Sequence, residues 1–171
     1  ILKKADKLIL PGVGAFKDAI DKLNEYGLTD VIKELVLDDG KPILGICLGL
    51  QLFFESSEEN PGVEGLGLLK GKIVRLPEGD DRKIPHMGWN QVDFTRVHPI
   101  MKGIKSGSDF YYVHSYHPVV SAEYAFAETT YGSQTFQGMV GKDNLIATQF
   151  HQEKSGDVGL AMLKNFCDWK V

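Results

Sequence analysis

The sequence has few cysteines, no long apolar run and no excess of positive charge, and each of these absences excludes a class of protein. Two cysteines in 171 residues make no disulfide framework. No apolar stretch approaches the ~20 residues of a membrane-spanning helix. A net charge of −4 gives no electrostatic basis for binding nucleic acid or an anionic membrane. With no signal-peptide pattern either, we expect a cytoplasmic protein.

Repeats, low-complexity tracts and flexible linkers are also missing, so we expect residues 1–171 to form a single domain. A hydrophobic content of 43% with 25% charged residues is typical of a globular chain. There is no Cys-x-x-Cys or His-Glu-x-x-His pattern. His114 and His117 near a strand end are candidate metal ligands together with His151, but without such a pattern we expect no metal and no cofactor.

Strands alternate with helices over the first sixty residues. Residues 8–10 predict a short strand, and residues 15–27 predict a helix that Gly27 ends. Thr29 is the expected cap of a second helix. A strand at residues 42–46 and a further helix follow. This alternation predicts an α/β domain with a largely parallel sheet.

The second part of the chain is richer in strands, several of which we expect to pair antiparallel. The predicted strands are residues 72–76, 91–97, 109–114, 124–129, 136–140 and 144–150. Residues 157–169 predict an amphipathic closing helix, with Cys167 filling the core beside Phe166. His86 and His98 fall in predicted loops, where we expect them to be solvated or locally hydrogen-bonded.

The run Gly45-Ile-Cys47-Leu-Gly49 is the most informative feature, because it joins a buried strand to a helix through a sharp turn. The serine form of this turn is the nucleophile elbow of hydrolases. A thiol at a helix N-terminus faces unpaired N–H groups, which favour the reactive thiolate. Gly45 and Gly49 leave room for the turn and for a substrate. The alternative is that Cys47 is a small buried side chain without chemistry.

A cysteine nucleophile needs a base, and the base needs a group that orients it. His151 follows the last predicted strand, and Glu153 lies two positions further on. In extended backbone these two side chains point to the same side. We therefore predict a Cys47–His151–Glu153 triad, the alternative being a histidine–glutamate pair on a wet surface.

An acyl-transfer intermediate also needs donors for its oxyanion. The Leu48 N–H directly after the nucleophile is one candidate, and Val13 or Gly14 in the Pro-Gly-Val-Gly segment offers another. That segment is equally well explained as a plain strand-to-helix turn. Gln51 lies one helical turn after Cys47, where it either meets a polar substrate or faces solvent.

Several segments resemble the class-I (triad) glutamine amidotransferases: Pro-Gly-Val-Gly-Ala-Phe, Gly-Ile-Cys-Leu-Gly-Leu-Gln and Phe-His-x-Glu-Lys-Ser. Pro-His-Met-Gly-Trp-Asn and Tyr-Val-His-Ser-Tyr narrow the resemblance to glutaminase subunits of imidazole glycerol phosphate synthase. The resemblance covers the chain from its first residues to its last helix. It implies an amidotransferase-like (flavodoxin-like) three-layer fold around a mixed, mostly parallel central sheet.

The resemblance also implies a reaction, hydrolysis of L-glutamine to glutamate and ammonia. Cys47 would attack the amide, His151 would shuttle the proton, and Glu153 would orient His151. A separate (β/α)8-barrel cyclase subunit would use the ammonia in histidine biosynthesis, since ammonia released into water becomes ammonium and loses its lone pair. By similarity, glutamine binding falls to Gly14, Gln51, Ser115 and Tyr116, and the partner interface includes Met87 and Trp89.

The chain departs from the family pattern in two places. Gln152 replaces the proline that usually separates the triad histidine and glutamate, which relaxes the backbone there and removes no catalytic group. The family also begins with a strand–helix–strand unit carrying an Asp-Tyr-Gly-type segment that has no match here. The chain opens with Ile1 rather than Met, and we expect that unit to be omitted from the sequence, because an open sheet edge favours aggregation.

Two alternatives to this glutaminase remain open from the sequence. One is a related triad cysteine hydrolase, such as a γ-glutamyl hydrolase or an amidotransferase of another synthase. The other is a non-catalytic scaffold subunit that kept the fold.

Overall fold

The strand that precedes the cysteine turn lies inside the sheet. In the computed structural model, which describes all of residues 1–171, β2 (Ile43–Ile46) pairs in parallel with β1 (Leu8–Leu10) and with β10 (Leu145–Thr148). All residues of β2 and β10 are buried. This burial explains their unbroken apolar sequences, since the sheet is covered on both faces at these strands.

Beyond β10 the sheet continues with antiparallel strands. Its order is β1-β2-β10-β9-β8-β5-β6, with β9 at Gln134–Lys142, β8 at Ala125–Tyr131, β5 at His86–Phe94 and β6 at Ser108–His114. The predicted α/β fold with a mixed sheet is confirmed. The expectation that this sheet is mostly parallel is wrong, because only β1, β2 and β10 run parallel in it. Short turns such as the one between β8 and β9 join neighbouring strands directly, and only antiparallel pairs allow this.

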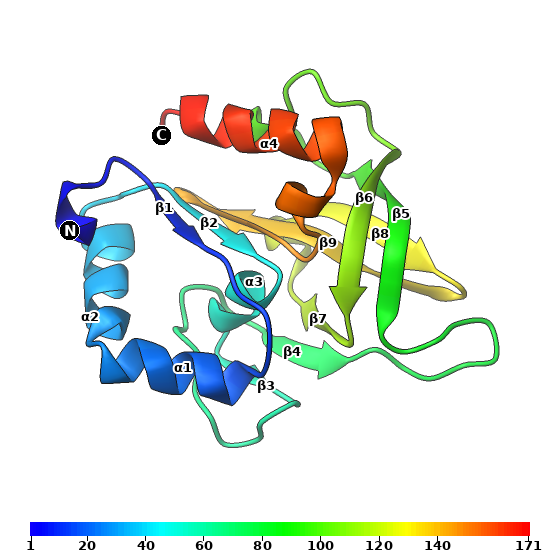
Figure 1. Cartoon of the computed structure of the whole chain (residues 1–171), viewed down its shortest axis with the longest axis horizontal. Helices are drawn as coiled ribbons and strands as arrows, with labels where there is room; N and C mark the ends of the chain where they lie inside the picture. Colours follow the sequence, from blue (N-terminus) through cyan, green and yellow to red (C-terminus); the bar gives the residue numbers. More distant parts are fainter.

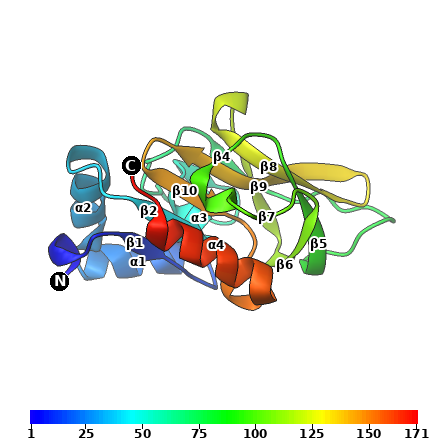
Figure 2. The same cartoon turned by 90° about the horizontal axis from the view of Figure 1, so that it is seen from above.

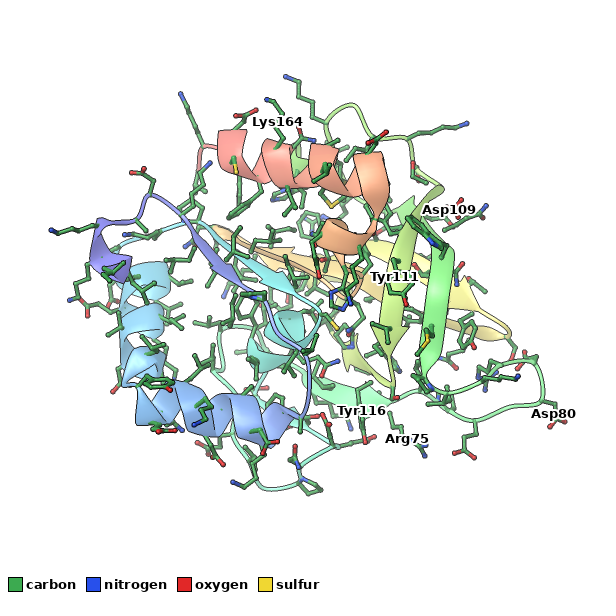
Figure 3. All side chains as sticks on the ribbon, in the orientation of Figure 1. Arg75, Asp80, Asp109, Tyr111, Tyr116 and Lys164 are labelled. Atoms are coloured by element: carbon green, nitrogen blue, oxygen red, sulfur yellow. The ribbon has the colours of Figure 1, made fainter.

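Helices cover both faces of this sheet. Figures 1 and 2 show α4 (Gly156–Asp168) on one face and α1 (Phe16–Glu25), α2 (Leu28–Lys33) and α3 (Leu48–Leu52) on the other. A small sheet of β3 (Ser56–Ser57), β4 (Lys72–Arg75) and β7 (Tyr116–Val119) packs beside α3. Arg75 and Tyr116 are register partners across β4 and β7 and lie side by side (Figure 3). None of the helices has the length and apolar character that a membrane crossing requires.

Alternate residues of the central strands separate into two apolar clusters. Ile43 and Leu145 belong to the cluster that contains α1, α2 and α3, whereas Leu44 and Ile146 belong to the cluster that contains Met162 of α4. Successive side chains of a strand point to opposite faces, so the two clusters lie on opposite sides of the sheet. The expected three-layer arrangement is therefore present.

Two local predictions are wrong. The N-cap of α2 is Gly27 in the left-handed region, while Thr29 lies inside the helix and its hydroxyl donates to Asn24. Cys167 is exposed, because Met162 and Phe166, four residues apart, already occupy the core-facing side of α4.

His86 and His98 are buried rather than solvated. His86 lies on β5, stacked on Tyr112 and Tyr131, so the strand begins earlier than predicted and includes the segment that was expected to be a loop. His98 packs edge-on against Phe126 and Trp169. Burial lowers the pKa of each imidazole to about 4, because the charged form loses its hydration.

The buried His98 predicts a loss of stability in mild acid. Its folded pKa is lowered below the ordinary value of about 6.5. As the pH falls, His98 is therefore protonated in the unfolded chain before it is protonated in the folded protein. Its contribution to the free energy of unfolding is present above pH 6.5 and is lost as the pH falls toward 4. We expect His98 to account for a loss on the order of 1–2 kcal/mol between pH 7 and pH 5. Urea unfolding at both pH values measures it.

His98→Asn is the matching variant, since an asparagine side chain also accepts from the Ile100 N–H that His98 Nδ1 now caps. The variant should show a smaller difference in unfolding free energy between the two pH values. An unchanged difference would show that His98 does not contribute to it.

Candidate active site

Cys47 occupies the sharp turn between β2 and α3. Its backbone has φ 54° and ψ −106°, a left-handed conformation that is uncommon for any residue but glycine. Its N–H donates to the Thr148 carbonyl at 2.8 Å, so the turn is tied to the end of β10. Backbone strain of this kind persists only where the surrounding structure holds it, and it concentrates at functional sites.

A pocket of about 180 Å³ opens beside this cysteine. Its wall brings together the seven residues that the sequence singled out for the thiol, the oxyanion donors and the substrate, which are Val13, Gly14, Cys47, Leu48, Gln51, Ser115 and Tyr116. Three further residues line it: Glu59, Val113 and His114. Drug-sized ligands occupy ~300–1,000 Å³. The smaller volume therefore suits a molecule of amino-acid size. Larger hollows lie near Pro99 and Lys102, away from any nucleophile.

The thiol is neutral in this state. Burial raises the pKa of Cys47 to about 11, because a thiolate there loses its hydration, and the Leu48 N–H and the Gln149 amide oppose this effect in part. The thiol donates to the Val113 carbonyl, with Sγ and O 3.8 Å apart. The expectation of a lowered pKa at this turn is therefore wrong for the free chain, because α3 has a single turn and desolvation exceeds the effect of its few N–H groups.

His151 and Glu153 contact each other directly. Their Nδ1 and Oε1 atoms are 2.5 Å apart, and His151 is buried while Glu153 is half-exposed. A carboxylate only accepts hydrogen bonds, so Nδ1 carries the proton and Nε2 keeps its lone pair. Nε2 is buried and has no hydrogen-bond partner. Such an imidazole is equipped to take up a proton.

The backbone that brings His151 and Glu153 together differs from the predicted one. Residues Gln152–Lys154 make a 3₁₀ turn rather than extended backbone, and the Gln152 side chain packs inward on Met162. The His151 N–H donates to the Tyr111 carbonyl at 2.9 Å, which ties the turn to β6. The sulfur and the imidazole share no hydrogen bond in this state, since the thiol contacts Val113 and Nε2 is unpaired.

Polar groups near the thiol form connected networks that the sequence did not reveal. His114 Nδ1 donates to the Tyr116 carbonyl at 2.8 Å, so its Nε2 accepts from His86 Nδ1 at 2.9 Å. Burial lowers the pKa of His114 to about 3. Gln51 is buried rather than solvated. No three His, Cys, Asp or Glu side chains gather as a metal site would require.

Met87 and Trp89 lie outside the pocket on β5, with exposed fractions of 62% and 56%. They are two positions apart and so share one face of the strand. Met87 is the register partner of Val113, whose carbonyl accepts the hydrogen bond of the thiol, and Trp89 contacts the Tyr111 ring edge-on. Met87 and Trp89 therefore form an exposed apolar pair on β5, the strand that pairs with β6, and β6 carries the Val113 carbonyl that contacts the thiol.

Comparison with known proteins gives the site a context. The family model for glutamine amidotransferase class-I matches residues 2–169. The imidazole glycerol phosphate synthase subunit HisH 1 of Campylobacter jejuni is 48% identical over 165 residues, covering 96% of this chain and 82% of that protein. Subunit HisH of Halalkalibacterium halodurans is 49% identical over 170 residues, covering 96% and 78%.

Solved structures agree on the fold. A glutamine amidotransferase crystal structure has a TM-score of 0.72 at 19% identity, covering 97% of this chain and 82% of that one. The structure of PurLQS from Thermotoga maritima has a TM-score of 0.68 at 18% identity, covering 95% and 79%.

Proposed function

The chain belongs to the class-I glutamine amidotransferases, among the imidazole glycerol phosphate synthase subunits HisH, and from this we propose that it is the glutaminase of such a synthase. It hydrolyses L-glutamine to glutamate and ammonia, in the cytoplasm. The observation that carries the proposal is a strained cysteine beside an amino-acid-sized pocket, in a chain whose His151 is held by Glu153 with its Nε2 free.

In the proposed reaction Sγ of Cys47 attacks the side-chain amide carbon of glutamine. The thiol proton passes to His151 Nε2 and then to the leaving nitrogen, which departs as ammonia and leaves a thioester. Water, deprotonated by the same Nε2, hydrolyses the thioester to glutamate and restores the thiol. Glu153 stabilises the imidazolium that forms in each half of the reaction.

The oxyanion of each tetrahedral intermediate needs preorganised N–H donors. We assign them to Leu48, directly after the nucleophile, and to Val13 or Gly14, which also line the pocket. Gly14 has φ +103°, a conformation that glycine adopts without a steric penalty because it has no Cβ. The substrate itself is held by Gly14, Gln51, Ser115 and Tyr116.

The partner in this proposal is the cyclase subunit, which receives the ammonia. Met87 and Trp89 form part of its docking surface, because a partner that covers them lies next to the strand that borders the thiol. Closing this face excludes water from the path of the ammonia and keeps its lone pair available.

The proposal predicts weak glutaminase activity from the subunit alone and strong stimulation by the ligand-loaded cyclase. The buried neutral thiol of the free chain accounts for the low basal rate. Stimulation by about ten-fold or more is expected, since each unit by which the thiol pKa falls gives ten-fold more thiolate. Glutamate release measured with and without the cyclase tests it, with γ-glutamyl amides other than glutamine as substrate controls. Equal rates in both conditions would count against the proposal.

A further inference from the structure

We propose that Gln149 is a catalytic residue, whose side-chain amide donates a hydrogen bond to Cys47 Sγ and stabilises the thiolate when the proton leaves. This inference rests on the proposed function for its effect on turnover, but the sulfur contact stands on geometry alone. Nε2 of Gln149 lies 3.7 Å from Sγ, within hydrogen-bonding distance for sulfur, and the Gln149 side chain is fully buried.

The surrounding hydrogen bonds fix which end of the amide faces the sulfur. The Tyr116 carbonyl only accepts, so Gln51 turns its Nε2 toward it, at 3.4 Å. The same Nε2 lies 3.4 Å from the Oε1 of Gln149. Because Oε1 of Gln149 is directed to Gln51, its NH₂ group is directed to Cys47.

The backbone of Gln149 is equally constrained. Its N–H donates to the Gly138 carbonyl at 2.9 Å, and the preceding residue, Thr148, accepts from the Cys47 N–H. Gln149 and Cys47 therefore follow the ends of two adjacent parallel strands, β10 and β2, whose register pairs Thr148 with Ile46. The donor is in place before any substrate arrives.

The need for this donor follows from the other groups around the sulfur. In the thiol form S–H donates to the Val113 carbonyl. Once the proton has gone to His151, that carbonyl dipole repels the thiolate, whereas a hydrogen bond from Gln149 becomes charge-assisted and stronger. Glu153 also disfavours the anion, and Lys154 favours it. Glu59, His114 and Tyr116 are the remaining titratable groups of the pocket.

The test measures the rate at which iodoacetamide alkylates Cys47 between pH 7 and 10, read by peptide mass spectrometry so that Cys167 does not interfere. Below the thiol pKa this rate follows the thiolate fraction. Gln149→Met keeps the length of the side chain and removes the donor, and we expect alkylation about ten-fold slower at each pH, which corresponds to a thiol pKa about one unit higher. With the cyclase present, kcat for glutamine should fall while KM changes little.

Gln152→Met is the matched control, because Gln152 is also a fully buried glutamine, but its amide contacts Met162 and its Oε1 has no partner. It should alkylate at the wild-type rate. Gln149→Glu keeps the shape of the side chain and replaces the NH₂ group by an oxygen. It should slow alkylation at least as much as Gln149→Met does. It therefore provides the test if Gln149→Met fails to fold.

The assignment would be overturned if the folded Gln149 variants were alkylated at Cys47 at the wild-type rate. It would also be overturned if Gln152→Met slowed this alkylation as much as Gln149→Met does. The outcome is independent of the proposed reaction, since iodoacetamide needs no glutamine site. Slower alkylation in a protein without glutaminase activity would keep the sulfur contact and reject the proposed function.

Discussion

Replacing Cys47 by serine is expected to lower glutaminase activity by on the order of 10⁴-fold or more in the complex with the cyclase. The serine hydroxyl keeps the shape of the turn, but an alcohol is a far weaker acid than a thiol, so it gives up its proton to a general base much less readily. Glutamate release measured in a coupled assay reports the loss.

The other cysteine provides the control for this variant. Cys167 is exposed on α4, far along the chain from the turn, and Cys167→Ser should keep wild-type activity and stability. Thermal unfolding should also show that Cys47→Ser is folded. A Cys47→Ser rate within ten-fold of wild type would mean that the reaction does not proceed through this sulfur.

Replacing Gly49 by alanine is expected to prevent folding or to lower the free energy of unfolding by about 3 kcal/mol or more. A Cβ at this position would lie 1.7 Å from the Leu10 carbonyl oxygen, which belongs to the backbone of β1. A shift of β1 would disturb its pairing with β2, and a shift of α3 would disturb the turn that carries Cys47. Urea unfolding monitored by circular dichroism measures the effect.

Gly12→Ala is the control for this prediction. A Cβ at Gly12 would lie 3.3 Å from the Leu48 side chain, which can move by a few tenths of an ångström. Its cost in unfolding free energy should stay within about 1 kcal/mol. Equal stability of Gly49→Ala and Gly12→Ala would show that β1 and α3 approach each other less closely than described.

The parts of the fold that sequence reasoning predicted depend on short-range patterns. The strand before Cys47 is apolar at each position, and the glycines around it mark the sharp turn, so both were predicted from a dozen residues. The histidine–glutamate pair was also predicted, although its backbone is a 3₁₀ turn, because the two side chains are too close in sequence to be far apart in space.

The parts that sequence reasoning missed depend on strand register. His86 is buried because it pairs with His114, 28 residues away, and nothing local marks either residue as internal. Gln149 resembles any other residue of an apolar strand until the parallel register of β10 and β2 brings its amide to the sulfur. The raised pKa of the Cys47 thiol was missed for a related reason. It follows from burial of the side chain, and that burial depends on elements that are distant in the sequence and pack over the turn.

The most direct test of the central claim is covalent labelling by a glutamine-analogue electrophile in the presence of the cyclase, with the adduct located by peptide mass spectrometry. The account predicts one adduct per chain, on Cys47, lost in Cys47→Ser and protected by glutamine. No adduct on Cys47 with the partner bound, or labelling only at Cys167, would contradict it.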